Sequence, residues 1–187
     1  DRDDTMASEA VRYTPNHSAD EYRRWEGDWE LWDGVPVCMS PSPTAKHQLV
    51  SLNLASALRD AIGGNVRCDC IVVYETDWQI GGSTVVRPDI SVLCSGLPNQ
   101  FIDYPPSVIV EVLSPSTADK DRTVKRQLYE GQGVAVYLLV DPDSGIIEAW
   151  HLADGKYIPL DAEDGMLTIR WDDDCRATIQ VSDVFAE

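Results

Sequence analysis

The stretch SVIVEVLSPST, residues 107–117, decides how the rest of the sequence is interpreted. Five of its first seven residues are branched and apolar, which predicts a buried β-strand that ends before Ser114-Pro115. One carboxylate, Glu111, lies in the middle of this apolar run. An ionised group out of water is costly unless it is paired with a cation, binds a metal or takes up a proton. We therefore expect Glu111 to have a partner elsewhere in the chain.

The segments before this strand predict a helix, a hairpin, a second helix and several strands. Residues 18–27 start with the capping-box pattern Ser-Ala-Asp-Glu and predict a short helix. Residues 28–43 predict an N-terminal hairpin that turns at Asp33-Gly34. Apolar residues at helical spacing predict an amphipathic helix over residues 47–62, and residues 66–80 and 85–93 are typical of strands.

The segments after this strand complete an α/β (α+β) fold. Residues 118–131 predict a helix, and the apolar run AVYLLVDP, residues 135–142, predicts a central strand. Residues 145–160 predict a C-terminal hairpin extension, whereas the last, acidic segment has no clear pattern. This order predicts a single mixed β-sheet flanked by helices. We expect a disordered or appended lead-in over residues 1–17 and one domain over residues 18–187.

Composition and charge are those of a soluble globular protein with an acidic surface. The 187 residues include 43% hydrophobic and 25% charged residues, and no apolar run approaches the roughly 20 residues of a membrane span. No charged-then-apolar leader marks the N-terminus. Fifteen basic and 32 acidic residues give a net charge of −17, which opposes binding to nucleic acids and membranes. A basic cluster over residues 120–126 predicts a local field that is more positive.

The five cysteines, an odd number at irregular spacing, predict reduced thiols in a cytoplasmic protein. Cys68-x-Cys70 is too short a pattern for a zinc site without a second pair of ligands. We therefore expect these cysteines to be small, buried apolar residues.

Asp89 and Glu111 predict a site for a divalent cation. Asp89 lies near the start of one predicted strand and Glu111 near the end of the next, so an antiparallel pairing places them roughly opposite each other. Direct cross-strand partners have Cβ atoms about 5 Å apart. Two carboxylates at that distance repel each other unless a cation lies between them. Oxygen ligands favour Mg²⁺ or Mn²⁺.

The helix that follows predicts a lysine near these carboxylates. Asp121, Lys125 and Tyr129 share one stripe at i, i+4 and i+8. Val124 and Leu128 lie beside this stripe and would press the helix onto the sheet. A lysine next to a metal-bound water can orient it, help to deprotonate it or neutralise charge in a phosphoryl transition state.

Several blocks of the sequence resemble a known nuclease family. Arg87-Pro88-Asp89, followed by Glu111 on the next strand, is similar to the pattern of the PD-(D/E)XK nuclease superfamily. GDWELWDGVPVCMSPSPTAKHQ, RPDISV, PPSVIVEVLSPSTADKDRTVKRQLYEGQGV and VYLLVDP look like the Uma-two family, a large bacterial set of candidate endonucleases that is also filed as a domain of unknown function. The resemblance covers residues 21–150, is expected to continue to the C-terminus, and implies a restriction-endonuclease-like fold.

The resemblance also implies the chemistry. It suggests a Mg²⁺-dependent endonuclease that acts on DNA, with the metal held by Asp89, Glu111 and the backbone carbonyl of Val112. Superfamily members often pair so that two sites meet two strands, which implies a homodimer. The superfamily's lysine follows the glutamate by two positions, but Leu113 occupies that position here. The resemblance therefore suggests a lysine that has moved to the next helix, Lys125, with Lys120 as the alternative.

Each candidate residue also has a structural interpretation. Asp89 could cap a turn, and Glu111 could pair with Arg87 or Arg122. Lys125 could form an ordinary i, i+4 salt bridge with Asp121. Other residues are placed with the site as well. Glu30 is a lone carboxylate among apolar neighbours of the hairpin, and we expect its partner to be either the metal or His47. The residues expected to support the site are His47, Ser114, Asp121 and Tyr129.

Two functions compete at this stage. The first is a metal-dependent endonuclease in which Asp89, Glu111, Lys125 and Glu30 are the catalytic residues. The second is a catalytically degenerate protein of the same fold that binds nucleic acid or a protein partner. The net charge of −17 favours this second function, or else a small or highly specific substrate. Enzymes with a cysteine or serine nucleophile have no support, because no motif brings a histidine near such a residue.

Overall fold

The computed structural model describes residues 14–39 and 42–187. Most of the predicted lead-in, residues 1–13, lies outside the described residues, as do residues 40 and 41 near the end of the predicted hairpin segment. Within the described ranges, no helix combines the length and the apolar character needed to cross a bilayer.

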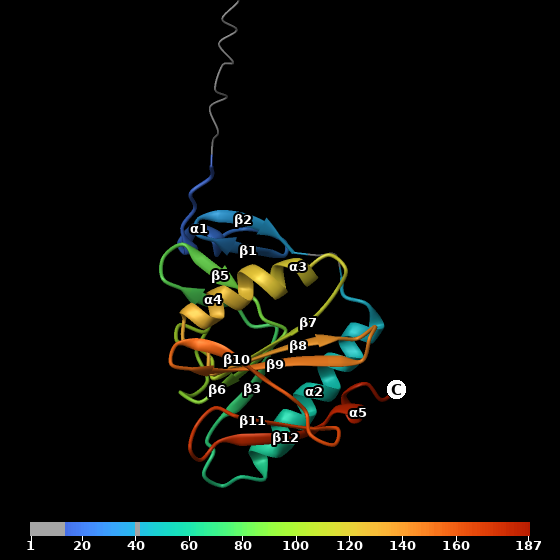
Figure 1. Cartoon of the computed structure of the whole chain (residues 1–187). Helices are drawn as coiled ribbons and strands as arrows, with labels where there is room; N and C mark the ends of the chain where they lie inside the picture. The colour runs from blue at the N-terminus through green and yellow to red at the C-terminus, as the bar shows by residue number, and fades with distance from the viewer. Residues whose placement is uncertain (1–13, 40–41) are drawn as a thin grey trace, which may run out of the picture.

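A six-stranded sheet forms the centre of the molecule (Figure 1), with the strand order β10-β9-β8-β7-β6-β3. The central pair, β7 and β8, is parallel, and the other neighbouring pairs are antiparallel. All five residues of β7 and the first five of β8 are buried, so the prediction that residues 135–142 form a central strand is confirmed. The six strands are β3 (Ile71–Tyr74), β6 (Ile90–Leu93), β7 (Val108–Val112), β8 (Val136–Asp141), β9 (Ile146–Ala153) and β10 (Lys156–Leu160).

Alternate residues of β7 face two different cores. Val108, Val110 and Val112 pack in the core that contains α2 (Ala45–Gly63), as the apolar spacing of that helix predicts. Ile109 points to the opposite face, where Tyr129 and Tyr137 are buried. Because side chains alternate along a strand, Glu111 shares the face of Ile109.

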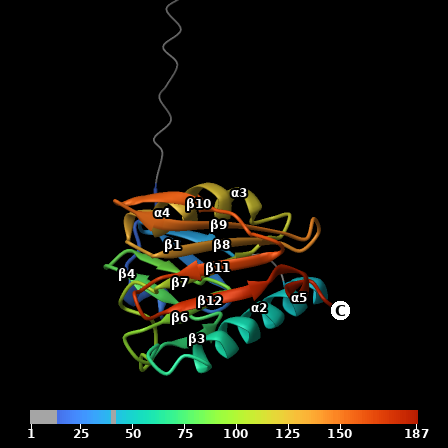
Figure 2. The same ribbon diagram turned by 60° about the horizontal axis from the view of Figure 1, so that its bottom comes forward.

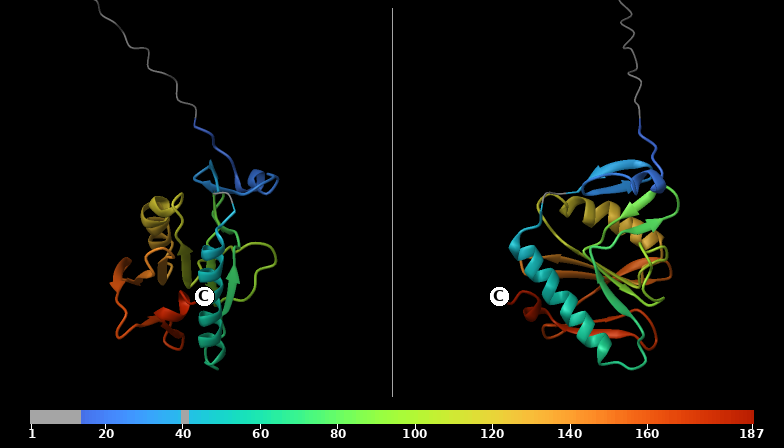
Figure 3. Two further views of the ribbon diagram at one scale, coloured as in Figure 1. Left: turned by 90° about the vertical axis from the view of Figure 1, so that its right-hand side faces the viewer. Right: turned by 180° about the vertical axis from the view of Figure 1, so that it is seen from behind.

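The helical connection from β7 to β8 covers this second face. Parallel strands need a long crossover, and here it consists of α3 (Ala118–Lys120), the π-helix η1 (Asp121–Lys125) and α4 (Arg126–Gly131). In Figure 3, this connection and α2 lie on different sides of the strands. The crossover therefore carries its side chains toward Glu111.

A separate four-stranded sheet, ordered β2-β1-β5-β4, lies at one end of the molecule (Figure 1). The prediction of a single sheet is therefore wrong, although the α/β (α+β) class is correct. The physical reason lies between β5 and β6, where Pro88 has no N–H to offer a ladder and the chain passes from one sheet to the other. The elements at this end are α1 (Ala19–Tyr22), β1 (Trp29–Trp32), β2 (Val35–Cys38), β4 (Trp78–Ile80) and β5 (Thr84–Val86).

The predicted N-terminal hairpin and capping box are confirmed. Asp33 and Gly34 have φ values of 47° and 81°, as a two-residue hairpin turn with two left-handed positions requires. This turn sets the register that places Glu30 opposite Val37. At α1, the Ser18 hydroxyl accepts from the backbone of Glu21, whose carboxylate accepts from the Ser18 backbone.

The C-terminal segment forms a hairpin that the sequence did not reveal. It comprises β11 (Met166–Arg170), β12 (Arg176–Gln180) and α5 (Val181–Val184), and β12 packs against α2 (Figure 2). Each strand buries only two residues in alternation, such as Leu167 and Ile169, and an acidic loop separates the strands. So short a pattern is too weak to predict a hairpin.

Four of the five cysteines are paired, so the prediction of reduced thiols is wrong. Cys68 is bonded to Cys175 and Cys70 to Cys94, while Cys38 is free and exposed. The pairing connects residues 107 and 24 positions apart in the sequence. Only the folded arrangement brings such distant thiols together, which is why irregular spacing gave no sign of it.

Candidate active site

A cavity of about 270 Å³ lies between the two sheets and the helical crossover. Charged side chains line it from β1, α2, β7, η1 and the link between β5 and β6. Nearly all of the candidate residues identified from the sequence contribute to this lining, namely Glu30, His47, Asp89, Glu111, Val112, Ser114, Lys120, Asp121 and Lys125.

Asp89 and Glu111 lie next to each other at the end of the β6–β7 ladder. The last pair of that ladder is Ile90 with Val110, so Asp89 is opposite Glu111 one step further on. The backbone N–H of Val112 donates to Oδ2 of Asp89 at 2.6 Å. The predicted register is therefore the observed one, and the Asp89 carboxylate is fixed by the backbone of the neighbouring strand.

Glu111 is buried, with 3% of its surface exposed, and two side chains of the crossover contact it. The Tyr129 hydroxyl donates to Oε1 of Glu111 at 2.7 Å, and Nζ of Lys125 lies 3.1 Å from the same oxygen. Both contacts use Oε1, so they leave Oε2 for a further ligand. The expectation that Glu111 has a partner elsewhere in the chain is therefore confirmed.

The expected alternative, an ion pair between Glu111 and an arginine, is wrong. Arg87 instead pairs with Asp77 at 2.7 Å and with Asp28 at 3.0 Å. Arg122 pairs with Glu148 at 2.8 Å. Both arginines therefore pair with acidic residues other than Glu111.

Lys125 lies at the centre of three buried carboxylates. Its Nζ is 3.0 Å from Oε1 of Glu30, 3.1 Å from Oε1 of Glu111 and 3.6 Å from Oδ1 of Asp121. The i, i+4 contact with Asp121 is thus present, but as one part of a buried cluster rather than as an exposed salt bridge. One ammonium cannot neutralise three carboxylates, so the cluster would have an excess of two negative charges if all three were ionised.

The π-helix η1 brings Asp121 and Lys125 inward. Both residues are buried, and the Tyr137 hydroxyl fixes the turn by donating to the backbone oxygen of Asp121 at 2.9 Å. The expectation that Val124 presses the helix onto the sheet is wrong, because Val124 is 48% exposed. The polar stripe itself faces the sheet. Single π-turns are frequent at functional sites, where they redirect side chains.

Glu30 contributes to the cluster from the hairpin. Its Oε1 accepts from the backbone N–H of Arg87 at 2.9 Å, and its Oε2 accepts from Nε1 of Trp32 at 3.1 Å. Together with Lys125, these donors satisfy a carboxylate that is only 4% exposed. Of the two partners that the sequence suggested, His47 is wrong, because Glu30 pairs with Lys125 instead.

His47 supports Asp89. Its Nε2 lies 3.5 Å from Oδ2 of Asp89, on the first turn of α2, which Thr44 caps. Burial lowers the pKa of His47, but the hydrogen bond and charge of Asp89 and the backbone of Val112 outweigh it and raise the pKa above the usual histidine value. His47 therefore tends to carry a positive charge beside Asp89.

Burial and the neighbouring charges shift the pKa values of Glu111 and Lys125. Burial raises the pKa of Glu111, Lys125 opposes this, and the carboxylates of Asp121, Asp89 and Glu30 raise it further, to well above the usual glutamate range. Burial lowers the pKa of Lys125, but the surrounding carboxylates outweigh it and hold the pKa well above the usual lysine range. The surrounding carboxylates therefore favour the charged form of Lys125, and without a further cation the cluster favours the protonated form of Glu111.

The donor atoms around the cavity fit a hard divalent cation. Oδ1 of Asp121 is buried and has no hydrogen-bond partner in the described part of the chain, although it faces Lys125. Asp89 and Glu111 each have one carboxylate oxygen outside the contacts given above, and Val112 also lines the cavity. Carboxylate and carbonyl oxygens are the ligands that Mg²⁺ and Mn²⁺ take.

Lys120 and Ser114 lie nearer the rim of the cavity. Lys120 places its Nζ 5.7 Å from the centre of the Trp32 ring, whereas Lys125 contacts Glu111 directly. The Ser114 hydroxyl lies 3.0 Å from the hydroxyl of Thr117, in the turn that opens the crossover. The geometry thus favours Lys125 over Lys120 as the lysine nearest the carboxylates.

The predicted positive field of residues 120–126 is cancelled in part, because two of the four basic residues have acidic partners. Lys125 is surrounded by carboxylates, Arg122 pairs with Glu148, and Arg126 lies 5.1 Å from the ring centre of Trp150. Of the four basic residues, Lys120 and Lys125 line the cavity. Sequence proximity overestimated the field because it showed none of these partners.

Glu75 is a carboxylate of the cavity that the sequence did not single out. It follows β3 with a φ of 44°, and its backbone N–H donates to the carbonyl oxygen of Asp89 at 3.0 Å. A left-handed conformation is uncommon for glutamate and marks a position held by its surroundings. No sequence pattern indicated it, because the contact depends on the pairing of β3 with β6.

Comparison with known proteins agrees with this geometry. The family described as "Uma2: Putative restriction endonuclease" matches residues 19–172. The chain belongs to this family. The resemblance that the motifs around Asp89 and Glu111 indicated is thereby confirmed, and the Uma2 match extends beyond residue 150 into the C-terminal region.

Two individual proteins illustrate the relationship. The uncharacterized protein slr1290 of Synechocystis sp. (strain ATCC 27184 / PCC 6803 / Kazusa) is 32% identical over 151 residues, which cover 75% of this chain and 76% of that protein. The crystal structure of a "putative nuclease belonging to DUF820" from Anabaena variabilis ATCC 29413 has a TM-score of 0.72 at 18% identity and covers 90% of this chain and 97% of its own. The chain therefore has the fold of a protein described as a nuclease.

Proposed function

We propose that this Uma2 protein is a metal-dependent endonuclease that hydrolyses phosphodiester bonds in DNA. The observation that carries the proposal is the cluster of Glu30, Glu111 and Asp121 around Lys125, in a cavity that Asp89 also lines. A purely structural ion pair would need one carboxylate for one ammonium. The additional buried carboxylates cost stability unless a second cation or a proton balances them.

A divalent cation balances the charge of this cavity without protonating Glu111. Asp89, Glu111 and the carbonyl of Val112 would hold the ion, and Mg²⁺ or Mn²⁺ suits these oxygen ligands. When bound, such an ion polarises a phosphoryl oxygen and lowers the pKa of a bound water. The family match supports a nuclease, and the choice of metal and of DNA as substrate is our proposal.

The other residues of the cavity have separate roles in the proposed reaction. Lys125 offers an ammonium that neutralises negative charge developing on the phosphate or orients the attacking water. Glu30 and Asp121 position this ammonium from opposite elements, the hairpin and the crossover. Tyr129 orients Glu111 through its hydroxyl, and His47 holds the carboxylate of Asp89 in place.

The acidic surface limits how DNA can be bound. A net charge of −17 repels a phosphate backbone, and two of the four residues of the basic cluster, Arg122 and Lys125, are neutralised by acidic partners. We propose that binding depends on the cavity cation and on Lys120 at the rim. A homodimer would present one cavity to each strand of a duplex, and the proposed location of this nuclease is the cytoplasm.

A nuclease assay tests the proposal directly. Purified protein is incubated with supercoiled plasmid, linear duplex, single-stranded DNA and RNA, in Mg²⁺, in Mn²⁺ and in a chelator. We expect DNA cleavage with either metal and none with the chelator. Cleavage that continues undiminished in the chelator contradicts metal dependence, and cleavage of RNA alone contradicts the proposed substrate.

The competing function is a binding module that has lost catalysis. The observation in its favour is that Lys125 already has three carboxylate partners, which a structural cluster would also show. Such a protein would bind DNA and slow its migration in a gel-shift experiment under every metal condition, and it would leave the DNA uncut. That result would replace the proposed activity by binding alone.

Binding of a divalent cation is expected to stabilise the protein more strongly as the pH rises. The raised pKa of Glu111 means that the folded state holds a proton that the unfolded chain releases near 4.5, so without metal the stability falls as the pH rises above that value. The charged groups facing Glu111 are Lys125, Asp121, Asp89 and Glu30. Metal and proton compete for the same carboxylate.

Thermal melts measure this linkage. At Mn²⁺ concentrations about 100 times the dissociation constant, we expect about 2.7 kcal/mol of stabilisation near pH 8 and clearly less near pH 5. The pair of exposed Lys156 and partly buried Glu130 lies outside the cavity, so Glu130→Gln is the matched control and should keep the full Mn²⁺ effect. An Mn²⁺ effect that is equal at both pH values contradicts binding at Glu111.

Lys120→Ala is expected to weaken DNA binding without changing the fold. Lys120 lies at the cavity rim on the last turn of α3, and losing one phosphate contact reduces the steepness of log K against log salt by about 0.9. The melting temperature should stay within the small range of surface substitutions. Fluorescence anisotropy at several salt concentrations measures the slope, and Lys156→Ala, an exposed lysine on β10, should leave it unchanged.

A further inference from the structure

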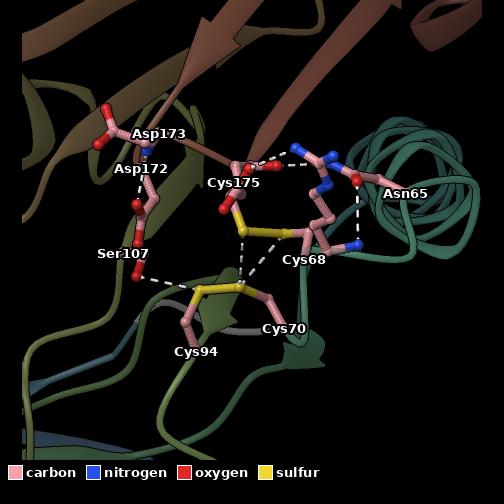
Figure 4. Close-up of a disulfide and its surroundings, with 10 residues drawn as sticks. Asn65, Cys68, Cys70, Cys94, Ser107, Asp172, Asp173 and Cys175 are labelled. Carbon is pink, nitrogen blue, oxygen red and sulfur yellow. Dashed lines mark hydrogen bonds and ion pairs between the residues drawn. A yellow bond between two sulfur atoms is a disulfide. The ribbon is translucent and has the colours of Figure 1, made fainter.

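Two disulfides, Cys68–Cys175 and Cys70–Cys94, lie next to each other in the fold (Figure 4). Cys68 and Cys70 lie just before β3, and Cys94 directly follows β6. Cys175 comes from the loop between β11 and β12. None of the four lines the candidate nuclease cavity, so this cluster is a second feature with chemistry of its own.

The two disulfides of the cluster are in contact with each other. Sγ of Cys70 lies 3.5 Å from Sγ of Cys68 and 3.6 Å from Sγ of Cys175, although Cys70 is bonded to Cys94. The sulfur atoms of Cys68, Cys70 and Cys175 all lie within 4.8 Å of one another. Two disulfides that only crosslink the chain do not have to contact each other. The short distances between their sulfur atoms therefore require an explanation.

Tetrahedral zinc coordination explains the spacing. Zinc–sulfur bonds of about 2.3 Å place the four sulfur atoms of a tetrathiolate site about 3.8 Å apart. The distances between the two disulfides are already close to that value. After reduction, the sulfur atoms within each pair have to separate, and Cys94, which is not part of the group within 4.8 Å, has to move toward Cys68 and Cys175.

The surroundings of the cluster suit a buried thiolate site. Cys68, Cys70 and Cys175 are each less than 9% exposed, so solvent has little access. The hydroxyl of Ser107 donates to Sγ of Cys94 at 3.3 Å, the kind of contact that stabilises a metal-bound thiolate.

We propose that the reduced protein binds one Zn²⁺ through the thiolates of Cys68, Cys70, Cys94 and Cys175. The two disulfides are then the oxidised form of the same site. Cys68-x-Cys70 alone is too short to indicate zinc, and the fold supplies the missing pair of ligands from residues 94 and 175. The inference does not depend on nuclease activity.

Conversion between the two forms is a balanced thiol–disulfide exchange. Two equivalents of a dithiol reductant deliver four electrons and four protons, both disulfide bonds break, and each dithiol becomes a disulfide. Zn²⁺ then replaces the protons of the four thiols, which are released to solvent. In the reverse direction, two equivalents of a disulfide oxidant accept the four electrons together with four protons from solvent and become dithiols, and the zinc ion leaves.

Both forms fasten the C-terminal hairpin to the six-stranded sheet. Cys175 lies beyond residue 172, where the Uma2 match ends, and it brings β12 to the end of α2 and the start of β3. The side chain of Asn65 donates to the backbone of Asp174 at 2.5 Å and holds the same loop. Loss of both the disulfides and the metal would therefore free this hairpin.

Cobalt binding tests the proposal on the full chain. The protein is reduced with a phosphine, the reductant is removed without oxygen, and Co²⁺ is added. We expect thiolate-to-cobalt charge-transfer bands and tetrahedral visible bands that saturate at one equivalent and disappear when Zn²⁺ displaces cobalt. The unreduced protein should show neither. The carboxylates around Glu111 cannot give a sulfur charge-transfer band, so this result is separate from metal binding in the nuclease cavity.

Variants identify the ligands. Cys38→Ser removes the free, exposed cysteine and should retain the full spectrum, whereas Cys94→Ser and Cys175→Ser should each weaken the bands and the affinity by at least tenfold. Native mass spectrometry of the reduced wild type avoids any folding defect of a variant and should show one bound zinc. A reduced wild type without zinc, or bands unchanged in both cluster variants, overturns the proposal.

Discussion

Glu111→Gln is expected to reduce DNA cleavage by about 10²-fold or more, a loss comparable to that caused by removing one group that stabilises charge in a reaction centre. Glutamine keeps the size of the side chain and still accepts a hydrogen bond from Tyr129, which lies 2.7 Å from Oε1. It removes the negative charge that faces Lys125 and the proposed metal. Initial cleavage rates at saturating Mg²⁺ measure the loss.

The same substitution should leave the fold intact. Burial already raises the pKa of Glu111, which favours the neutral form of this side chain without metal, and glutamine imitates that form. We expect the melting temperature without metal to stay close to wild type and the increase caused by Mn²⁺ to disappear. Glu148→Gln, which removes the surface partner of Arg122, is the matched control and should keep both cleavage and the Mn²⁺ effect. Wild-type cleavage by Glu111→Gln would exclude this carboxylate from the reaction.

The sequence could place Asp89 opposite Glu111 because strand pairing is local. The two strands follow each other along the chain, and the buried face of each fixes the register, since a shift by one residue would turn the apolar residues to the wrong side. The same holds for the stripe of Asp121, Lys125 and Tyr129, which depends only on helical spacing. Both predictions therefore rest on relations between residues that are close together in the sequence.

The partners of Glu30 and of the cysteines could not be predicted in this way. Glu30 meets Lys125 only because its hairpin joins a separate sheet that closes one side of the cavity. Cys68 meets Cys175 across 107 residues, and a hairpin without a readable pattern carries the second cysteine. The exposure of Val124 depends on the π-turn, an insertion that helical periodicity does not reveal.

Lys125→Met is expected to destabilise the protein by about 3–5 kcal/mol at neutral pH, the usual result of removing one partner from a buried ion pair. Methionine fills a similar volume but leaves Glu30, Glu111 and Asp121 without the ammonium that lies 3.0 to 3.6 Å from them. Urea unfolding of the metal-free protein measures the loss. Lys156→Met removes the exposed partner of Glu130 and should cost at most about 1 kcal/mol.

The pH dependence shows whether charge is the cause. Without Lys125, the raised pKa of Glu111 rises further, so the folded variant binds more protons than its unfolded chain and gains stability as the pH falls toward 4.5. The difference between Lys125→Met and wild type should therefore narrow in acid. Adding Glu30→Gln to Lys125→Met removes one of the uncompensated carboxylates and should recover part of the loss at neutral pH. A deficit that stays constant with pH and is not reduced by Glu30→Gln would point to lost packing instead, and the excess of buried negative charge would no longer argue for a metal in this cavity.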